Sequence, residues 1–468
     1  MSILFRRVSL PYGPPTGVVD VRVDDAAVTA VGVHLPATGV DEVVHGRGGA
    51  LIPGLHDHHI HLHALAASTW SVRCGPPQVT SADGLAAALD AAGADQAGWV
   101  RGVGYVETVA GLLDSTRLDR LHARRPVRLQ HRSGAVWFLN SAAAERVGLA
   151  TADHPGVERD ESGAPTGRVW RADDWLRDRL GRAAPPDLSS VGTSLARHGI
   201  TGVTDATPDL DADALRDLVE AHTRGAVPQR LHLLGAPTAD LPATVGAGPV
   251  KIVLADSDLP DFDVLCDRIG TAHDAGRGVA VHSVTRESLI LLLAALDEVG
   301  AHPDDRVEHG AIIAADTVGE LRRRRLTVVT QPGFLADRGD DFLDRLDAAD
   351  VPDLYRCRSL VDHDVPLAMS SDAPYGPVDP WAVVDAAATR RAPDGRIIGE
   401  DERIDRTTAL ARYLAPLAQP GGAPRTVHAG APADLVLLDG ALHDALARGS
   451  EAVRHTVIGG RTVYRRAD

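Results

Sequence analysis

Two histidines two residues apart give the clearest chemical signal in the chain. His59 and His61 lie in the run PGLHDHHIHL, residues 53–62. On a β-strand, side chains two apart point to the same face, so both imidazoles can reach one metal ion. The alternative is a polar strand end with no ligand role. Three more histidines crowd the run: His56, His58 and His63.

Further residues of ligand type end later apolar segments. Lys251 lies in VKIVLAD, His282 ends VAVHS, His309 lies in RVEHG and Asp372 closes VPLAMSSD. Taken singly, a histidine at a strand end is usually structural, and an aspartate after a strand usually caps a helix. Their joint placement at the carboxyl ends of predicted strands instead indicates metal chemistry.

Lys251 is also the single lysine among 48 lysine and arginine residues. Because the chain uses arginine at every other basic position, the retained lysine indicates a position where arginine does not serve. The lysine amine shifts its pKa on burial and can act as a nucleophile, whereas a guanidinium stays charged. The alternative is chance survival of a surface lysine.

The segments that position these residues alternate with Ala/Leu-rich helical stretches, which is typical of a parallel sheet. Eight such strands predict a (β/α)8 barrel, whose active site lies at the carboxyl ends of the strands. An open doubly wound sheet is the structural alternative. The strands are expected at 51–61, 200–206, 230–236, 250–256, 279–283, 306–310, 326–332 and 365–372.

Both ends of the chain have short β-like runs punctuated by Gly, Pro and Asp. We expect residues 1–52 and 425–468 to form one small β-sandwich domain and residues 53–424 to form the barrel. About 140 residues separate the first two strands, more than a βα unit needs. Residues 64–190, approximately, are therefore expected to be an inserted subdomain over the barrel mouth.

Composition excludes several classes of protein. The chain has 468 residues, 44% of them hydrophobic and 24% charged, so disorder and fibrous repeats are excluded. A net charge of −16 gives no support for nucleic-acid or anionic-membrane binding. Cys74, Cys266 and Cys357 form no CxxC motif, which disfavours a disulfide framework or a thiolate zinc site.

The expected location is the cytoplasm, because the N-terminus lacks the apolar core of a signal peptide and no apolar run approaches about 18 residues. The expected partner is a small-molecule substrate, with neither nucleic acid nor membrane. Whether identical chains assemble into a homo-oligomer stays open.

Several motifs together resemble the amidohydrolase superfamily, and within it the branch of N-substituted formamide deformylases and YtcJ-like proteins. The resemblance covers most of the chain, including WVRGVGY and RPVRL in the insertion and the segment ITGVTDA. The matching residues are Pro53, Gly54, Asp57, His59 and His61; Val250–Ile252; Arg306, Glu308 and His309; Asn140 and Ser141; Gln331 and Pro332; and Ser371, Asp372, Pro374, Asp379 and Pro380.

The resemblance implies a centre of two Zn²⁺ ions. His59, His61 and Asp372 would hold one metal, and His282 and His309 the other. Lys251, carboxylated by carbon dioxide, would bridge them together with a hydroxide. Such a hydroxide attacks at neutral pH because a metal lowers the pKa of its bound water to about 7. Asp372 would take its proton and pass it to the leaving amine.

Substrate contacts are less well defined. Gln331 ends a predicted strand, where it would either bind substrate or have a structural role. Tyr105 and Trp137 in the insertion are candidate pocket-lining aromatics, although core or lid packing is the favoured interpretation for each of them. Arg286, four residues past His282, could reach into the barrel mouth. The sequence departs from the branch at 133–135, where Ser-Gly-Ala replaces Asp-Gly-His.

The leading hypothesis is a hydrolase that cleaves a non-peptide C–N bond in an amide, formamide, lactam or carbamate-like substrate. The losses at 133–135 favour a neutral, apolar substrate. A mononuclear deaminase of a heterocyclic amidine is the first alternative, and Lys251 argues against it. A catalytically inactive scaffold is the second, and the complete ligand set argues against that.

Overall fold

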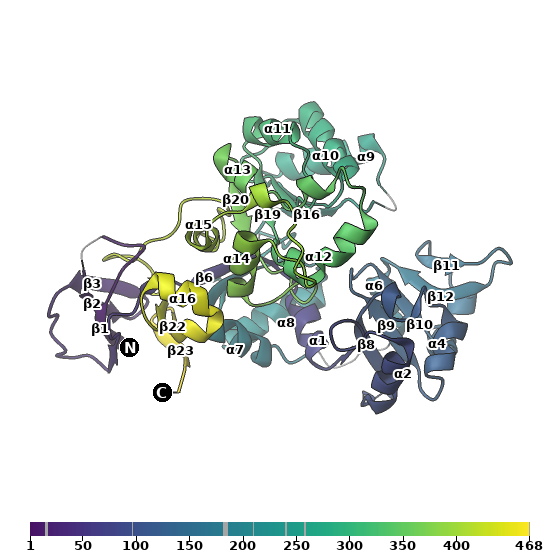
Figure 1. Ribbon diagram of the computed structural model, residues 1–468, viewed down its shortest axis with the longest axis horizontal. Coiled ribbons are helices and arrows are strands. Elements are labelled where there is room, and N and C mark those ends of the chain that lie inside the picture. Colours follow the sequence, from purple (N-terminus) through teal and green to yellow (C-terminus); the bar gives the residue numbers. More distant parts are fainter. Residues whose placement is uncertain are drawn as a thin grey trace. The chain divides into compact units, whose positions relative to one another are not determined.

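The computed structural model describes residues 1–14, 17–95, 97–180, 186–208, 210–238, 241–256 and 259–467 (Figure 1). The chain divides into two compact units. One unit comprises Met1–Leu62 and Leu188–Asp468, and the other is His63–Asp187. The expected insertion spanned about 64–190. Residues 181–185, near its expected end, lie outside the described residues.

Among the described residues of the first unit, eight strands of parallel ladders each lie within a segment expected from the sequence. They form two ladders, of which the first also contains the short strand β15 (Val245–Ala247). The fold is therefore of the α/β barrel type, as predicted. The strands are β6 (Leu55–Ile60), β13 (Ile200–Asp205), β14 (Arg230–Leu233), β16 (Val250–Val253), β17 (Val279–Ser283), β18 (Arg306–His309), β19 (Thr327–Thr330) and β20 (Leu367–Met369).

Backbone hydrogen bonds join the two ladders at both seams. Just past the end of β14, the amide of Gly235 donates to the carbonyl of Pro249, the residue before β16, at 2.8 Å. Between β6 and the end of β20, Asp372 N donates to His59 O at 2.8 Å, and His61 N donates to Ala373 O at 2.9 Å. The second seam therefore brings the first and last ligand segments side by side.

Helices pack outside the strands because each presents an apolar stripe to them. Figure 1 shows α9, α10, α11 and α13 along the strands β16–β20. Val281 and Val307 on strands share one buried cluster with Ile269 and Leu292 on helices. The helices are α7 (Ser189–Arg197), α8 (Ala212–Thr223), α9 (Phe262–Asp274), α10 (Arg286–Val299), α11 (Thr317–Arg324), α12 (Gly333–Arg345), α13 (Arg358–Asp362), α14 (Pro380–Thr389), α15 (Arg406–Ala411) and α16 (Leu442–Arg448).

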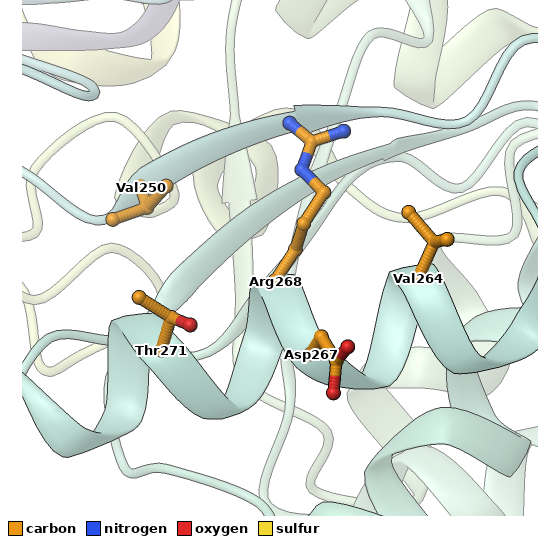
Figure 2. Close-up of a pocket in the computed structure, with 5 residues that line it drawn as sticks. All are labelled: Val250, Val264, Asp267, Arg268 and Thr271. Atoms are coloured by element: carbon orange, nitrogen blue, oxygen red, sulfur yellow. The ribbon is translucent and has the colours of Figure 1, made fainter.

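Val250 shows which way the neighbouring lysine must point. Val250 packs against the helix layer and borders a hollow of about 320 Å³ beside α9, lined also by Val264, Arg268 and Thr271 (Figure 2). Because successive strand residues face opposite sides, Lys251 is directed away from α9, toward the barrel interior. The hollow belongs to the helical outside of the barrel.

The expected single strand at 51–61 is wrong, because the segment forms two strands in two sheets. β5 (Leu51–Pro53) pairs with β21 (Leu435–Leu438), and β6 enters the barrel. Gly54 separates them. A Cβ at Gly54 would lie 2.1 Å from the Thr201 side chain, so the crossing between sheets requires glycine.

The two chain ends supply two four-stranded sheets, ordered β3-β2-β1-β4 and β23-β22-β21-β5. Apolar residues from both, including Phe5 and Leu437, share one buried cluster. The remaining strands of these sheets are β1 (Ser2–Val8), β2 (Val19–Asp24), β3 (Ala27–Gly32), β4 (Glu42–His45), β22 (Val453–Ile458) and β23 (Arg461–Arg465).

The second unit is built on a six-stranded sheet of order β11-β12-β10-β9-β8-β7. Its strands are β7 (Val72–Arg73), β8 (Val100–Tyr105), β9 (Val127–His131), β10 (Val136–Leu139), β11 (Val157–Arg159) and β12 (Pro165–Trp170). Its helices are α2 (Ala82–Ala91), α3 (Glu107–Ala110), α4 (Ser115–Leu121), α5 (Ser141–Arg146) and α6 (Asp173–Leu180), and α1 (Leu62–Thr69) begins at the last residue of the first unit.

Candidate metal centre

Three of the predicted ligands meet where β6 and β20 end. One ligand atom from each of His59, His61 and Asp372 lies within 4.8 Å of the others. Asp372 Oδ1 lies 3.1 Å from His61 Nε2 and 3.5 Å from His59 Nε2. His59 is buried, whereas the side chain of His61 is 13% exposed, so solvent reaches the cluster beside His61.

The two later histidines lie next to this group. The ring centroid of His309 is 4.8 Å from that of His59 and 4.5 Å from that of His282. Asp372 Oδ2 lies 3.9 Å from His309 Nδ1. The structure thus gathers two histidines from one strand, one from each of two later strands and one aspartate at the carboxyl end of the barrel.

Lys251 is buried, with 8% of its surface exposed, and its amine interacts electrostatically with Glu308 and Asp372. Its Nζ has no hydrogen-bond partner among the described residues. Burial, reinforced by the charge of Arg306, lowers the pKa of the Lys251 amine to about 8 against the opposing carboxylates of Glu308 and Asp372. A buried, unpartnered amine beside metal-ligand side chains fits a carbamate-bridged metal site, because carbamate formation requires the neutral amine.

Electrostatics favour the protonation states that bind metal. Burial lowers the pKa of the His59 imidazole to about 3, although the Glu308 carboxylate opposes this effect. Burial alone would raise the pKa of Asp372, but the ring nitrogen of His61 and the neighbouring imidazoles hold that pKa below its usual range. At neutral pH, His59 is therefore neutral and Asp372 ionised, as metal coordination requires.

Two ligand residues adopt left-handed backbone conformations. His309 has a φ of 71° and Asp372 a φ of 52°. Such values are uncommon outside glycine and cost of order 1–3 kcal/mol, so surrounding contacts must impose them. At Asp372 the contact is the hydrogen bond from its amide to His59 O, which turns the chain at the strand end toward the neighbouring histidines.

Glu308 supports the centre from below, although the sequence singled it out only as part of a motif. Its carboxylate accepts from His59 Nδ1 and from Arg306 Nε, and Arg306 also donates to His58 O at 2.9 Å. All three side chains are buried. The alternation of Arg306 and Glu308 on one strand was the available signal, because residues two apart share a face.

Asp57 ties the first and last barrel strands together. Its Oδ1 accepts from Ser371 N at 3.1 Å and from His59 N at 3.3 Å. Burial raises the pKa of the Asp57 carboxyl to about 7, although the hydrogen bonds from Ser371 oppose this effect. Asp57 therefore holds the backbone beside two ligand residues.

Gln331 lies at the centre but is engaged by the protein itself. Its Oε1 accepts from His309 Nδ1 at 2.9 Å. Its Nε2 donates to Ser370 Oγ at 2.9 Å and to Val329 O at 3.2 Å. These contacts place Gln331 as the partner of a ligand histidine, whereas the sequence suggested contact with substrate.

The other three expected substrate contacts lie among different groups. Tyr105 is buried in the core of the second unit, and its hydroxyl donates to Gly111 O. Trp137 is buried in the same unit, where its Nε1 donates to Asp173 at 2.8 Å. Both have the packing and hydrogen bonds of core residues.

Arg286, at the start of α10, is paired with two carboxylates. It donates to Asp350 Oδ1 and to Asp353 Oδ2. It also lines an outer groove of about 530 Å³ with residues of α10 and α11. Its charge is thus already balanced within the barrel unit.

The barrel, with its histidine and aspartate cluster at the carboxyl ends of the strands, has the architecture of a metal-dependent hydrolase. Residues 42–464 match the sequence model of the amidohydrolase family, and the chain belongs to that family. It is accordingly a hydrolase acting on carbon–nitrogen bonds. Within the described residues, no helix is both long and apolar enough to span a membrane.

Individual relatives cover nearly the whole chain. An N-substituted formamide deformylase of Arthrobacter pascens is 25% identical over 90% of this chain and 89% of its own length. The putative amidohydrolase YtcJ of Bacillus subtilis is 24% identical over 90% of each chain. An uncharacterized metal-dependent hydrolase from Pyrococcus horikoshii has a similar fold, with a TM-score of 0.75, 19% identity, and coverage of 97% of this chain and 100% of that one.

Proposed function

We propose that this chain hydrolyses a non-peptide C–N bond of an amide, formamide, lactam or carbamate-like substrate at a metal centre, with Asp372 as the proton shuttle. The observation that carries the proposal is the cluster of His59, His61 and Asp372, together with the buried Lys251. The Lys251 amine interacts electrostatically with Asp372 and has no hydrogen-bond partner among the described residues. The family supports the class of bond, and the name of one relative, an N-substituted formamide deformylase, supports an amide-like carbonyl in the substrate.

The proposed ligands form two sets. His59, His61 and Asp372 would hold one Zn²⁺, and His282 and His309 would hold a second. The carbamate of Lys251 would supply its oxygens as further ligands. Bound there, zinc would supply an activated water at neutral pH and polarise the substrate carbonyl.

Lys251 enters this centre as a carbamate. Its neutral amine attacks carbon dioxide, an N–C bond forms, and one proton leaves the nitrogen for solvent. One C=O π bond of carbon dioxide is lost in the step, and the product is a carbamate whose single negative charge is shared by two oxygens at the end of a long side chain. An arginine at this position stays a cation. The lowered pKa of Lys251 supports the step because it increases the fraction of neutral amine.

Asp372 moves the proton. Its carboxylate is ionised at neutral pH and lies beside the one ligand histidine of its group that solvent reaches. It accepts a proton from the attacking water and then donates that proton to the leaving nitrogen. This transfer avoids expulsion of an amine anion, and acid–base catalysis of this kind contributes about 10²–10⁴-fold.

Substituted formamides are the first substrates to examine, because one relative is named for deformylation of such compounds. The deaminase alternative remains less well supported, since a mononuclear deaminase has no use for Lys251. The two sheets from the chain ends are proposed to form a β-sandwich, and His63–Asp187 is proposed to be the insertion after the first barrel strand.

The test combines metal removal with a substrate panel. Purified full-length protein is treated with a chelator, then supplied with Zn²⁺ and bicarbonate, and assayed for amine release from N-alkyl formamides, N-acyl amines and lactams. We expect activity on at least one neutral amide, loss with the chelator and recovery with zinc. The His59→Asn variant should not recover. Activity that survives complete metal removal would contradict the proposal.

A further inference from the structure

Two of the clustered histidines are backed by acceptors of different charge. His59 Nδ1 contacts a carboxylate oxygen of Glu308, whereas His309 Nδ1 contacts the amide oxygen of Gln331 at 2.9 Å. All four side chains are at least nine-tenths buried. In the proposed metal centre, the acceptor behind His59 is therefore a charged carboxylate, and the acceptor behind His309 is a neutral amide.

The surrounding hydrogen bonds fix which nitrogen of each ring carries the proton. The other oxygen of Glu308 accepts from Arg306 Nε, so the carboxylate is ion-paired and acts only as an acceptor. Gln331 Nε2 donates to Ser370 Oγ and Val329 O, which orients its Oε1 toward His309. Nδ1 is consequently the protonated nitrogen in both rings, and Nε2 keeps its lone pair.

An acceptor behind a ligand histidine changes how strongly the other nitrogen binds metal. A carboxylate draws the Nδ1 proton and makes Nε2 a stronger donor, and a hydrogen bond to a charged acceptor is roughly twice as strong as one to a neutral acceptor. The arrangement of the ligand atoms also favours tighter binding at the position of His59. His59, His61 and Asp372 already offer three ligand atoms within 4.8 Å of one another.

We propose that Glu308 makes the position formed by His59, His61 and Asp372 the tighter metal site, which fills first, and that Gln331 leaves the position of His309 and His282 weaker. Glu308 and Gln331 are positioning residues that act through the histidines. The inference rests on the proposed metal centre and adds an order of loading to it. Single-metal and two-metal forms of the chain would then coexist at intermediate zinc concentrations.

The experiment is a calorimetric titration of metal-free full-length protein with Zn²⁺, in buffer containing bicarbonate. We expect two separable binding constants in the unaltered chain. Loss of a support behind a ligand histidine typically costs about 10–100-fold in affinity. Glu308→Gln should weaken the tighter constant by that factor and leave the weaker one unchanged. Gln331→Met, the matched control, should weaken only the weaker constant.

A structural effect must be separated from a positioning effect, because Glu308→Gln leaves buried Arg306 without its carboxylate. The double variant Arg306→Met/Glu308→Gln removes both charges and should show the same loss at the tighter site. Thermal unfolding of each metal-free variant measures stability independently of zinc. We expect the change in zinc affinity to persist in the double variant even where its metal-free stability matches that of the original chain.

The outcomes distinguish failure of the proposed order of loading from failure of the proposed function. Equal affinities at both sites, or a Glu308→Gln variant that weakens both constants together or neither, would overturn the order of loading while leaving a metal centre intact. An original chain that binds no zinc would overturn the proposed function itself. A drop confined to the tighter constant, reproduced in the double variant, supports the inference.

Discussion

Carboxylation of Lys251 should follow the titration of its own amine. The pKa of about 8 refers to the metal-free chain, in which burial disfavours the ammonium form. With that pKa, about one amine in a hundred is neutral at pH 6, about one in ten at pH 7 and about nine in ten at pH 9. An ordinary lysine, with a pKa of about 10.4, would be neutral in only about one molecule in 2,500 at pH 7.

The assay follows recovery of activity after zinc is added to metal-free protein, with dissolved CO₂ held at one concentration at every pH. Only the neutral amine attacks CO₂, so the initial rate of recovery should rise about ninety-fold from pH 6 to pH 9. Most of that rise should fall below pH 8.5, after which the rate levels. Lys251→Arg should not recover at any pH, although it keeps a positive charge.

Two results would refute this reasoning. A recovery rate that continues to rise tenfold per pH unit beyond pH 9 would show an ordinary, solvated lysine. Recovery that is independent of CO₂, or a Lys251→Arg variant with two bound zinc ions and full activity, would show that no carbamate is needed.

Further predictions address other residues. Asp372→Asn should lower kcat by at least about 10²-fold while zinc content, measured by elemental analysis, falls less, and an unchanged kcat would exclude Asp372 as the shuttle. Gly54→Ala should lower the free energy of unfolding by about 1–3 kcal/mol, because its Cβ meets Thr201, and denaturant titration would measure the loss. Arg286→Ala should leave the ratio of kcat/KM for neutral and carboxylate-bearing amides unchanged, since Asp350 and Asp353 already bind its guanidinium. A collapse of activity toward the carboxylate-bearing amides alone would instead identify Arg286 as a substrate anchor.

The clustering of the candidate ligand residues could be predicted from the sequence because it obeys local rules. Strand periodicity places His59 and His61 on one edge, and parallel strands bring their carboxyl ends together. Single-lysine usage identified Lys251 without any structure, and its burial is what that exception implied. The eight barrel strands were visible for the same reason, since each is a short apolar run bounded by helical sequence.

Aromatic and cationic residues near motifs were less informative. Tyr105 and Trp137 have the same residue types whether they line a pocket or fill a core, and only the tertiary contacts show them packed in the second unit. Arg286 likewise could not be assigned from spacing to His282, because its carboxylate partners Asp350 and Asp353 lie more than 60 residues away in sequence.

What the sequence determined is therefore the strands and the candidate donors that they carry, since both depend on residue type and a period of two. The tertiary structure decided which groups support the donors. Glu308 reaches His59 across 249 positions and Gln331 reaches His309 across 22, and neither pairing has a local pattern. Glycine is needed at position 54, where the chain passes from one sheet to another, because Thr201 leaves no room for a Cβ. Only folding brings Thr201 near Gly54. Contacts between distant segments depend on barrel closure, and closure is a property of the whole sheet.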